Sequence, residues 1–308
     1  MRHCRVMPET SAAELGTLSR LIREWFGQHG RDLPWRQDDF GAWGILVSEI
    51  MLQQTPVVRV IPRLEQWLAR WPTPEALASA SPGDAVRAWE RLGYPRRALN
   101  LHAAATMITE NHGGIVPEDV ASLLALPGVG DYTARAVAAF AYGHRHPVVD
   151  TNVRRVIARA VLGQGHAGPP STQRDLSAME ELLPTDVATA RATNAAVMEL
   201  GALVCTARKP LCDECPVKQL CQWRATGYPA YEGKPQAMQK RFEGSDRQVR
   251  GLILAELRAS DVPVTAAEIA DVWPDVEQRV RALSGLVTDG LIVHVGSGYE
   301  FPSSVLLS

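Results

Sequence analysis

The sequence has no long apolar run. Its first ten residues, MRHCRVMPET, hold no stretch of the length that a signal peptide needs, and no later segment is apolar for long enough to span a bilayer. We therefore expect neither a secretory leader nor a membrane-spanning helix. We expect a cytoplasmic protein that has no membrane partner.

Lysine is scarce, and its few copies lie late in the chain. Residues 1–208 contain none. A lysine amine is the nucleophile that forms a Schiff base with a carbonyl substrate, so this part of the chain has no residue for that reaction. The four lysines are Lys209, Lys218, Lys234 and Lys240.

A strong excess of positive charge is also missing. The formal net charge is −2 at pH 7, which argues against a uniformly basic coat for nucleic acid, although binding needs only a local positive face. At 308 residues the chain exceeds the usual size of one domain, so we expect two or three hydrophobic cores. We find no internal repeat.

Four cysteines stand close together at the spacing C-x6-C-x2-C-x5-C, and they are Cys205, Cys212, Cys215 and Cys221. Four thiolates suit either a tetrahedral zinc ion or an iron–sulfur cluster. Zinc sites usually present two cysteine pairs separated by a longer finger, whereas one compact loop supplies all four ligands here. The spacing therefore favours a [4Fe–4S] cluster. Disulfides would need an oxidising compartment that nothing else in the chain indicates.

Apolar residues recur at helical spacing before the cysteines, as in LSRLIREWF and VIPRLEQWLARW, so residues 1–225 are expected to be helical. Residues 226–244 are rich in glycine, proline and polar side chains, which predicts a linker. Residues 245–308 form a different pattern. It consists of three short helical stretches and then LIVHVGSGYEF, which reads as a hairpin.

Each helical stretch of this tail opens with a capping pair, as Thr265 with Glu268 illustrates. Three helices followed by a hairpin fit a winged-helix-like α+β domain. In such a domain the helix that carries Arg279 and Arg281 would read a DNA groove. The alternative is a cap that contacts only the rest of the protein.

A glycine turn joins two helical patterns in LLALPGVGDYTARAVAAF, residues 123–140. Its residues are Pro127, Gly128, Val129 and Gly130. Free N–H groups and the positive dipole end at the start of the second helix bind phosphate without sequence preference. By itself this turn is equally a simple hairpin of two helices.

The run LPGVG, the segment VVDTNVRRV and the cysteine loop together resemble the helix-hairpin-helix DNA glycosylase superfamily over roughly residues 12–225. Within it, LPWR at 33–36, VSEIMLQQT at 47–55 and LGY at 92–94 resemble MutY-type adenine glycosylases. Those enzymes remove adenine that is mispaired with 8-oxoguanine. The resemblance implies a monomer that binds double-stranded DNA containing a mispaired adenine.

The resemblance also implies a mostly α-helical fold of two lobes within residues 1–225. One is a six-helix lobe at 40–148, and the other is an iron–sulfur lobe made of 12–39 and 149–225. The cluster is expected to be structural or redox-sensing, because cysteine would occupy every iron corner and leave no open site.

Asp150 ends the apolar run HPVVD and opens the helical TNVRRVIARAV. A carboxylate at a positive helix end is favoured in its ionised form. Cleavage of an N-glycosidic bond develops an oxocarbenium-like sugar, which an ionised carboxylate stabilises or bonds covalently. An ordinary N-cap explains the same position, and the two roles are compatible.

Glu49 lies in ILVSEIML, an apolar helical stretch. Burial would raise its pKa, so that a protonated Glu49 gives its proton to a purine nitrogen and makes adenine a leaving group. Two carboxyl groups in opposed environments would then serve as acid and anion. The alternative is that Glu49 points to solvent beside Ser48 and Gln53.

Tyr132 occupies the place where relatives that also cleave the strand, which resemble endonuclease III, carry a Schiff-base lysine. The resemblance therefore implies a monofunctional glycosylase. Asn152 would hold Asp150 or the sugar backbone by hydrogen bonds, and its alternative is a solvated helix start.

Five further residues are expected to contact DNA, and three of them match positions that bind DNA in the family. Arg36 matches the contact to the adenine edge, and Gln54 and Thr55 match residues that enter the duplex near the opposing base. An N-cap before Pro56 explains Thr55 as well. Arg208 and Lys209 lie between the first two cysteines and would contact phosphates.

Three positions depart from the family pattern: Pro95 replaces a second aromatic, Ala195 replaces Glu or Gln, and Thr151 replaces Gly. The tail also resembles a winged helix, whereas many relatives carry a Nudix-like domain that reads 8-oxoguanine. Two alternatives to adenine excision therefore stay open. One is a glycosylase that removes thymine from G:T pairs, and the other is a non-catalytic iron–sulfur regulator that binds DNA and senses redox state.

Overall fold

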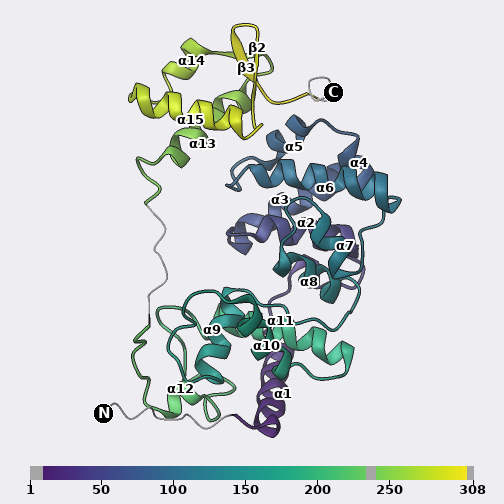
Figure 1. The fold of residues 1–308 in the computed structure, drawn as a ribbon, viewed down its shortest axis with the longest axis vertical. Coiled ribbons are helices and arrows are strands. Elements are labelled where there is room, and N and C mark those ends of the chain that lie inside the picture. Colours follow the sequence, from purple (N-terminus) through teal and green to yellow (C-terminus); the bar gives the residue numbers. More distant parts are fainter. Residues whose placement is uncertain (1–9, 234–240, 304–308) are drawn as a thin grey trace. The chain divides into compact units, whose positions relative to one another are not determined.

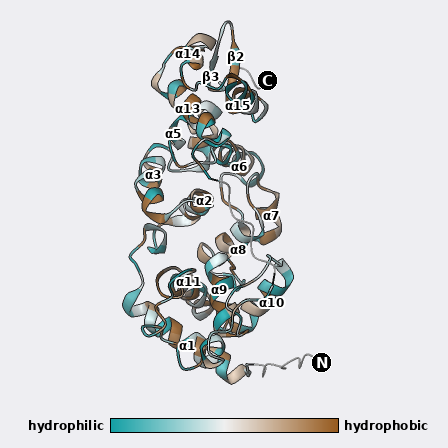
Figure 2. Ribbon diagram, turned by 90° about the vertical axis from the view of Figure 1, so that its left-hand side faces the viewer, coloured by the Kyte–Doolittle hydropathy of each residue, from teal (hydrophilic) through white to brown (hydrophobic). Residues whose placement is uncertain are grey.

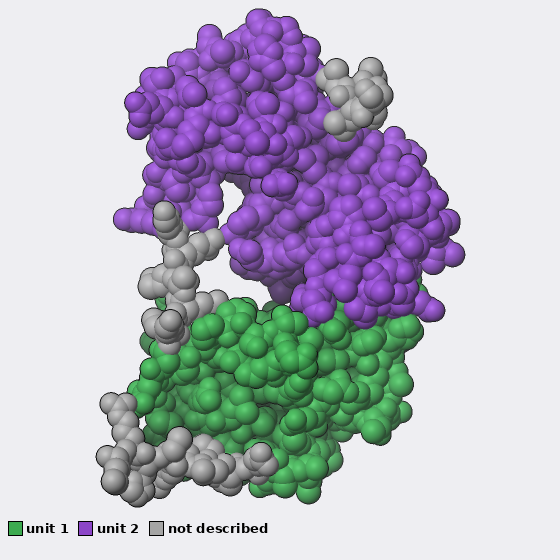
Figure 3. Space-filling model, viewed as in Figure 1, with its two compact units in different colours: residues 1–37, 134–237 green, residues 38–133, 238–308 purple. Residues whose placement is uncertain are grey.

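The computed structural model describes residues 10–233 and 241–303, and these residues form a mostly helical fold with one small sheet (Figure 1). The chain divides into two compact units (Figure 3). Unit 1 contains residues 1–37 and 134–237, and unit 2 contains residues 38–133 and 238–308. The fold class predicted from the sequence is confirmed, while the domain bounds given above stay a prediction.

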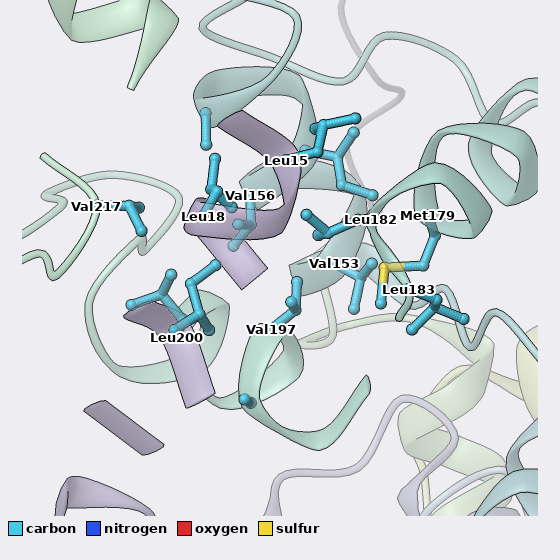
Figure 4. Close-up of a cluster of buried hydrophobic side chains, with 14 of the residues drawn as sticks. Leu15, Leu18, Val153, Val156, Met179, Leu182, Leu183, Val197, Leu200 and Val217 are labelled. Atoms are coloured by element: carbon cyan, nitrogen blue, oxygen red, sulfur yellow. The ribbon is translucent and has the colours of Figure 1, made fainter. Parts of the chain in front are cut away.

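Unit 1 is built on one hydrophobic core that four helices share. A capping box between Ser11 and Glu14 starts the first of them. Figure 4 shows apolar side chains of the four helices converging, among them Leu18, Val156 and Leu200. The helices of this unit are α1 (Ala12–His29), α9 (Thr151–Ala160), α10 (Thr172–Leu182), α11 (Val187–Leu203) and the short α12 (Gln222–Ala225), with a 3-10 turn at Pro34–Arg36.

Two helices of unit 2 each begin with a hydroxyl-bearing N-cap and a proline. Thr73 and Ser81 are the N-caps, and their hydroxyls accept hydrogen bonds from the backbone N–H groups three residues further on, those of Ala76 and Asp84. A proline follows each N-cap at the first helical position. α3 (Val57–Arg70) buries Val60, Leu64 and Trp67 along one face, so apolar and polar stretches alternate along it in Figure 2. The helices are α2 (Gly41–Leu52), α3 (Val57–Arg70), α4 (Pro74–Ala78), α5 (Pro82–Trp89), α6 (Arg96–His112) and α7 (Val120–Ala125), and α8 (Asp131–Phe140) continues into unit 1.

The tail adds three helices and a three-stranded antiparallel sheet of order β1-β3-β2. The hairpin expected around Gly296 is present, because Val295 pairs with Gly298 across a two-residue turn. Strand β1, which the sequence did not reveal, pairs with β3 on its other side. The elements are α13 (Asp246–Ala259), β1 (Val264–Thr265), α14 (Ala266–Ala270), α15 (Val276–Thr288), β2 (Val293–Val295) and β3 (Gly298–Glu300).

Of the three capping pairs in the tail, two form as expected: Thr265 makes a full capping box and Asp275 accepts from the N–H of Gln278. Ser245 precedes α13 but makes no side-chain cap; its hydroxyl donates instead to the carbonyl of Phe242 at 2.6 Å.

Within unit 2 the tail packs against α5. The N–H of Gly83 donates to the carbonyl of Pro302 at 2.8 Å, and a Cβ at this glycine would lie 2.5 Å from that oxygen. Arg87 donates to the carbonyls of Arg258 and Ser260 at 2.8 and 3.2 Å. These contacts favour the reading of the tail as a cap on the rest of the protein.

The two arginines expected to read a DNA groove are engaged inside unit 2. Arg279 donates to the carbonyl of Ala270, the last residue of α14, and to the carbonyl of Trp273 in the segment that follows it. Arg281 makes a bidentate ion pair with Asp246, at 2.8 and 3.0 Å.

A membrane-spanning helix must combine length with apolar character, and no helix within residues 10–233 and 241–303 does so.

Candidate functional site

Glu49 lies within α2, the most deeply buried helix of unit 2. Every residue from Trp43 to Met51 is buried, which is typical of a helix that is apolar on all sides. Only 5% of Glu49 is exposed. The alternative in which Glu49 points to solvent is therefore wrong, and the burial inferred from its neighbours is confirmed.

Asp150 is the N-cap of α9. Its Oδ1 accepts from the N–H of Val153 at 2.7 Å, and its Oδ2 accepts from Nδ2 of Asn152 at 2.7 Å. The N-cap interpretation is thus confirmed, and it occupies part of each carboxyl oxygen's accepting capacity. Because an oxygen of an ionised carboxylate accepts more than one hydrogen bond, each oxygen keeps the capacity to accept a further one.

The electrostatics of Asp150 differ from the sequence expectation. Burial raises the pKa of this carboxyl above its usual value, even though hydrogen bonds from Val153 and Asn152 and the charge of Arg155 act in the opposite direction. The helix end alone predicted a more readily ionised group. Desolvation outweighs it here because the low-dielectric surroundings disfavour the charged form.

Asn152 joins Asp150 to the cysteine segment through Arg155. The Oδ1 of Asn152 accepts from Nη2 of Arg155 at 2.7 Å, and Arg155 also donates to the carbonyls of Gly201 and Cys205, at 2.6 Å each. α9 and α11 approach closely at this point, since a Cβ at Gly201 would lie 2.7 Å from the Cβ of Asn152. The proposed solvated state of Asn152 is therefore not what the structure shows.

All four cysteines line one pocket of unit 1, together with Arg159 and Trp223. Four thiols around one shared space fit the ligand set of an iron–sulfur cluster. Burial raises the pKa of Cys215 to about 12, so iron would be needed to keep it as the thiolate that ligates metal.

Arg159 of α9 supports the segment that carries these cysteines. Its guanidinium donates to the carbonyls of Thr206 and Ala207 at 2.7 and 3.1 Å, and Nη1 lies 3.5 Å from the Sγ of Cys205. Cations and N–H donors near cluster sulfurs stabilise the negative charge of the thiolates. The residues present therefore fit an iron–sulfur cluster.

The glycine turn between α7 and α8 has the expected form. Gly128 has φ +78° and is exposed, and a Cβ there would lie 2.7 Å from the Cβ of Asn100. Glycine is thus required both by the backbone conformation and by the close approach. Gly130 is also exposed, whereas Val129 points into unit 2 with 7% exposed. Pro127 is half-buried.

Gln54 and Thr55 behave differently. Gln54 is exposed and has a left-handed backbone with φ 57°. Thr55 is 6% exposed, and its hydroxyl donates to the carbonyl of Leu92 at 3.2 Å. The prediction that Thr55 enters the duplex therefore does not fit the structure, because its side chain faces inward. The alternative that Thr55 is an N-cap is also wrong, since Pro56 occupies the N-cap position of α3.

Tyr132 lies in the first turn of α8 and is half-buried.

In unit 1, Arg208 and Lys209 are exposed on the segment between the first two cysteines. The carbonyl of Lys209 accepts from the hydroxyl of Thr206 at 2.7 Å, which fixes the bend of that segment. Both cations are thus presented to solvent as the phosphate-binding role requires.

Arg36 is held by a residue that the sequence reading missed, Glu199 of α11. Nη2 of Arg36 donates to Glu199 at 2.9 Å, and Arg31 makes a second ion pair with it at 2.7 Å. The carboxyl of Glu199 is buried, yet these two arginines lower its pKa to about 2. A glutamate in the apolar run AAVMELGAL was the available signal, the same kind that identified Glu49.

Two family models match the chain. Residues 47–181 match the HhH-GPD superfamily of base excision DNA repair proteins, and residues 205–221 match the iron–sulfur binding domain of endonuclease III. The chain belongs to the HhH-GPD superfamily, and its four cysteines form an iron–sulfur cluster binding segment.

Comparison with curated relatives identifies the family within this superfamily. The adenine DNA glycosylase of Mycobacterium tuberculosis is 50% identical over 95% of this chain and 96% of its own length. That of Mycolicibacterium smegmatis is 52% identical over 90% of this chain and 93% of its own length. Within the superfamily, the chain belongs to the adenine DNA glycosylase family. Because the first match covers nearly the whole chain, most of the tail is shared with that relative.

Other relatives and solved structures match about two thirds of the chain. A thymine-DNA glycosylase of Aeropyrum pernix is 37% identical over 66% of this chain and 92% of its own length. The structure of a thermostable thymine-DNA glycosylase matches with a TM-score of 0.64 at 27% identity, over 70% of this chain and 98% of that one. A complex of endonuclease III with DNA matches with a TM-score of 0.61 at 21% identity, which shows the shared fold.

Proposed function

We propose that this chain removes adenine mispaired with 8-oxoguanine or guanine from double-stranded DNA by hydrolysing the N-glycosidic bond. The near full-length likeness to adenine DNA glycosylases supports the substrate. The observation that carries the mechanism is the burial of Glu49, with 5% exposed, in an apolar helix. Burial disfavours the charged form of a carboxyl group, which suits a residue that delivers a proton to a base.

In this mechanism the adenine leaves the duplex, and Glu49 protonates one of its ring nitrogens. The ionised Asp150 then stabilises the positive sugar as the bond to the base breaks, and water completes the hydrolysis. Asn152 holds Oδ2 of Asp150 in place during these steps. Arg36, whose guanidinium Glu199 orients, is proposed to contact the adenine edge.

The duplex is proposed to lie against three further groups. Gly128 and Gly130 present the start of α8 to a phosphate. Arg208 and Lys209 add two positive charges, and Gln54 approaches the base that was paired with the adenine. The iron–sulfur cluster, when bound, supplies a rigid centre for the segment that carries these two cations. We further propose that the protein acts as a monomer in the cytoplasm.

Base release from a panel of duplexes tests the substrate. We expect single-turnover release of adenine to be fastest opposite 8-oxoguanine, slower opposite guanine, and absent for a normal A:T pair. Alkali reveals the abasic sites, and thymine opposite guanine is included as a fourth substrate. Release of thymine in preference to adenine would contradict the proposal.

A thymine glycosylase for G:T pairs is the second candidate, and a specific observation favours it: the likeness to thymine-DNA glycosylases in both sequence and structure. Those matches cover 66% and 70% of this chain, whereas the adenine-specific relative covers 95%. The buried Glu49 also favours adenine, because protonation assists the departure of a purine.

We expect a monofunctional enzyme that leaves the strand intact. Residues 1–208 contain no lysine, and the place beside the glycine turn is filled by Tyr132, so no amine is available there to form an imine with the opened sugar. Borohydride added during turnover should trap no covalent adduct between protein and DNA. A stable adduct on a denaturing gel would show that an amine elsewhere attacks the sugar.

A further inference from the structure

Arg97 is buried at the start of α6, with 7% of the residue exposed. Its Nη1 donates to the carbonyl oxygens of Ile50, Met51 and Gln53 at 2.9, 2.9 and 2.6 Å. These carbonyls lie at the C-terminal end of α2, where a helix leaves its last acceptors without internal donors and where a cation complements the dipole. Arg97 therefore caps the helix that carries Glu49.

The other side of the same guanidinium contacts residues 92–94, the segment LGY. Nη2 donates to the carbonyl of Gly93 at 2.8 Å and to the hydroxyl of Thr55 at 2.9 Å, and Nε makes a longer contact of 3.4 Å with the carbonyl of Tyr94. The Cζ of Arg97 also lies 5.1 Å from the ring centre of Trp89 and 5.7 Å from that of Tyr94. One planar fork of five donors thus joins two segments that are about forty residues apart in sequence.

Each of these two segments presents one exposed side chain on a left-handed backbone. Gln54 has φ 57° and Tyr94 has φ 48°, and 39% of Tyr94 is exposed. Residues other than glycine hold such angles only where their surroundings impose them, and these positions gather at binding sites. The acceptors of Arg97 include both neighbours of Gln54 and the residue before Tyr94, so Arg97 acts directly on the two strained backbones.

We propose that Arg97 is a positioning residue that holds Gln54 and Tyr94 at one fixed separation against the duplex, and so sets how strongly the opposing base affects excision. This inference rests on the proposed function, in which Gln54 lies near the opposing base. Displacement of a positioned group by about 1 Å costs about 100-fold in rate. Since the group displaced here meets the opposing base, the loss falls on discrimination between opposing bases.

The test compares Arg97→Lys with Arg96→Lys in the full-length protein with its cluster. Arg96 is the matched control because it is the preceding residue of α6, its side chain is 65% exposed, and it pairs with Asp289 at 3.3 Å. Single-turnover release of adenine is measured opposite 8-oxoguanine and opposite guanine, together with the melting temperature. Arg97→Lys should lower the ratio of the two rates by at least about tenfold, and Arg96→Lys should leave it unchanged.

A lowered melting temperature with an unchanged ratio would overturn the proposal, because Arg97 would then serve stability alone. If Arg97→Lys does not fold, Thr55→Val replaces it: this substitution keeps the volume of a buried side chain and removes one acceptor of Arg97. The ratio should again fall, and a folded Thr55→Val protein with full discrimination would equally overturn the proposal. A wild-type protein that releases no adenine opposite either base would contradict the proposed function as well. Equal discrimination by the wild type and the variants, with adenine still released, would contradict only the role of Arg97.

Discussion

Glu49→Gln is expected to lower the single-turnover rate of adenine release by about 100- to 10,000-fold, the usual contribution of general acid–base catalysis. Glutamine has almost the same shape as glutamic acid but has no acidic proton to deliver to the base. Because the residue is 5% exposed and lies in a helix that is buried from Trp43 to Met51, solvent is poorly placed to supply the proton instead. The measurement is base release at saturating enzyme, opposite 8-oxoguanine.

Glu65→Gln is the control for this substitution. Glu65 is an exposed glutamate of α3 in the same unit, so the change removes one charge without touching the buried helix. We expect its rate to equal that of the wild type and the melting temperatures of all three proteins to be similar. A Glu49→Gln protein with the full rate would remove Glu49 from the mechanism.

Much of this fold follows from local signals in the sequence. The capping pair of Thr265 and Glu268 predicts the start of α14, because such a pair depends on residues within one turn. The spacing of the four cysteines predicts the cluster segment for the same reason, and the matching family model confirms it. The burial of Glu49 also follows from its immediate apolar neighbours.

Features that depend on distant residues were not predictable in this way. Glu199 meets Arg31 across 168 positions of the sequence, and Arg97 meets Ile50 across 47. No local pattern announces either contact. Thr55 shows the consequence: it matches family residues that enter the duplex, yet its hydroxyl accepts a hydrogen bond from the buried Arg97 of another helix.

The sign of the pKa shift at Asp150 depends on the same long-range packing. A helix start stabilises the ionised form, and that part was read correctly from the sequence. Burial by the surrounding helices is a property of the assembled unit. It raises the pKa of Asp150 by more than the local hydrogen bonds lower it. Sequence alone therefore located the carboxyl group but gave its electrostatics with the wrong sign.

Asp150→Asn is expected to reduce the single-turnover rate by about 100- to 1,000-fold, the loss that follows removal of one preorganised electrostatic stabiliser. The substitution is a clean test because asparagine caps helices about as well as aspartate, so the bond from the N–H of Val153 should persist. What disappears is the negative charge that faces the developing positive sugar. The rate is measured on adenine opposite 8-oxoguanine, beside the melting temperature at several pH values.

The stability of the Asp150→Asn protein carries the second half of the argument. Since the folded-state pKa of Asp150 is raised, the folded protein binds more protons than the unfolded chain between the ordinary aspartate pKa of 3.8 and that raised pKa. The carboxyl group therefore costs stability as pH rises through this window, and the cost persists at neutral pH. Asp150→Asn should accordingly melt at the same or a higher temperature than the wild type at pH 7, and lose that advantage below the window.

Asp186 provides the contrasting N-cap in unit 1. It caps α11 by accepting from the N–H of Thr189 at 2.8 Å, and hydrogen bonds from Thr189 lower its pKa. Its contribution to stability is thus present at neutral pH and is lost as pH falls through the lowered pKa, so Asp186→Asn should melt slightly lower at pH 7 while keeping the full rate. A loss of rate and a gain of stability only at Asp150 would show that this carboxylate is kept ionised at an energetic cost because catalysis needs the charge. Equal behaviour of the two variants would instead reduce Asp150 to a helix cap.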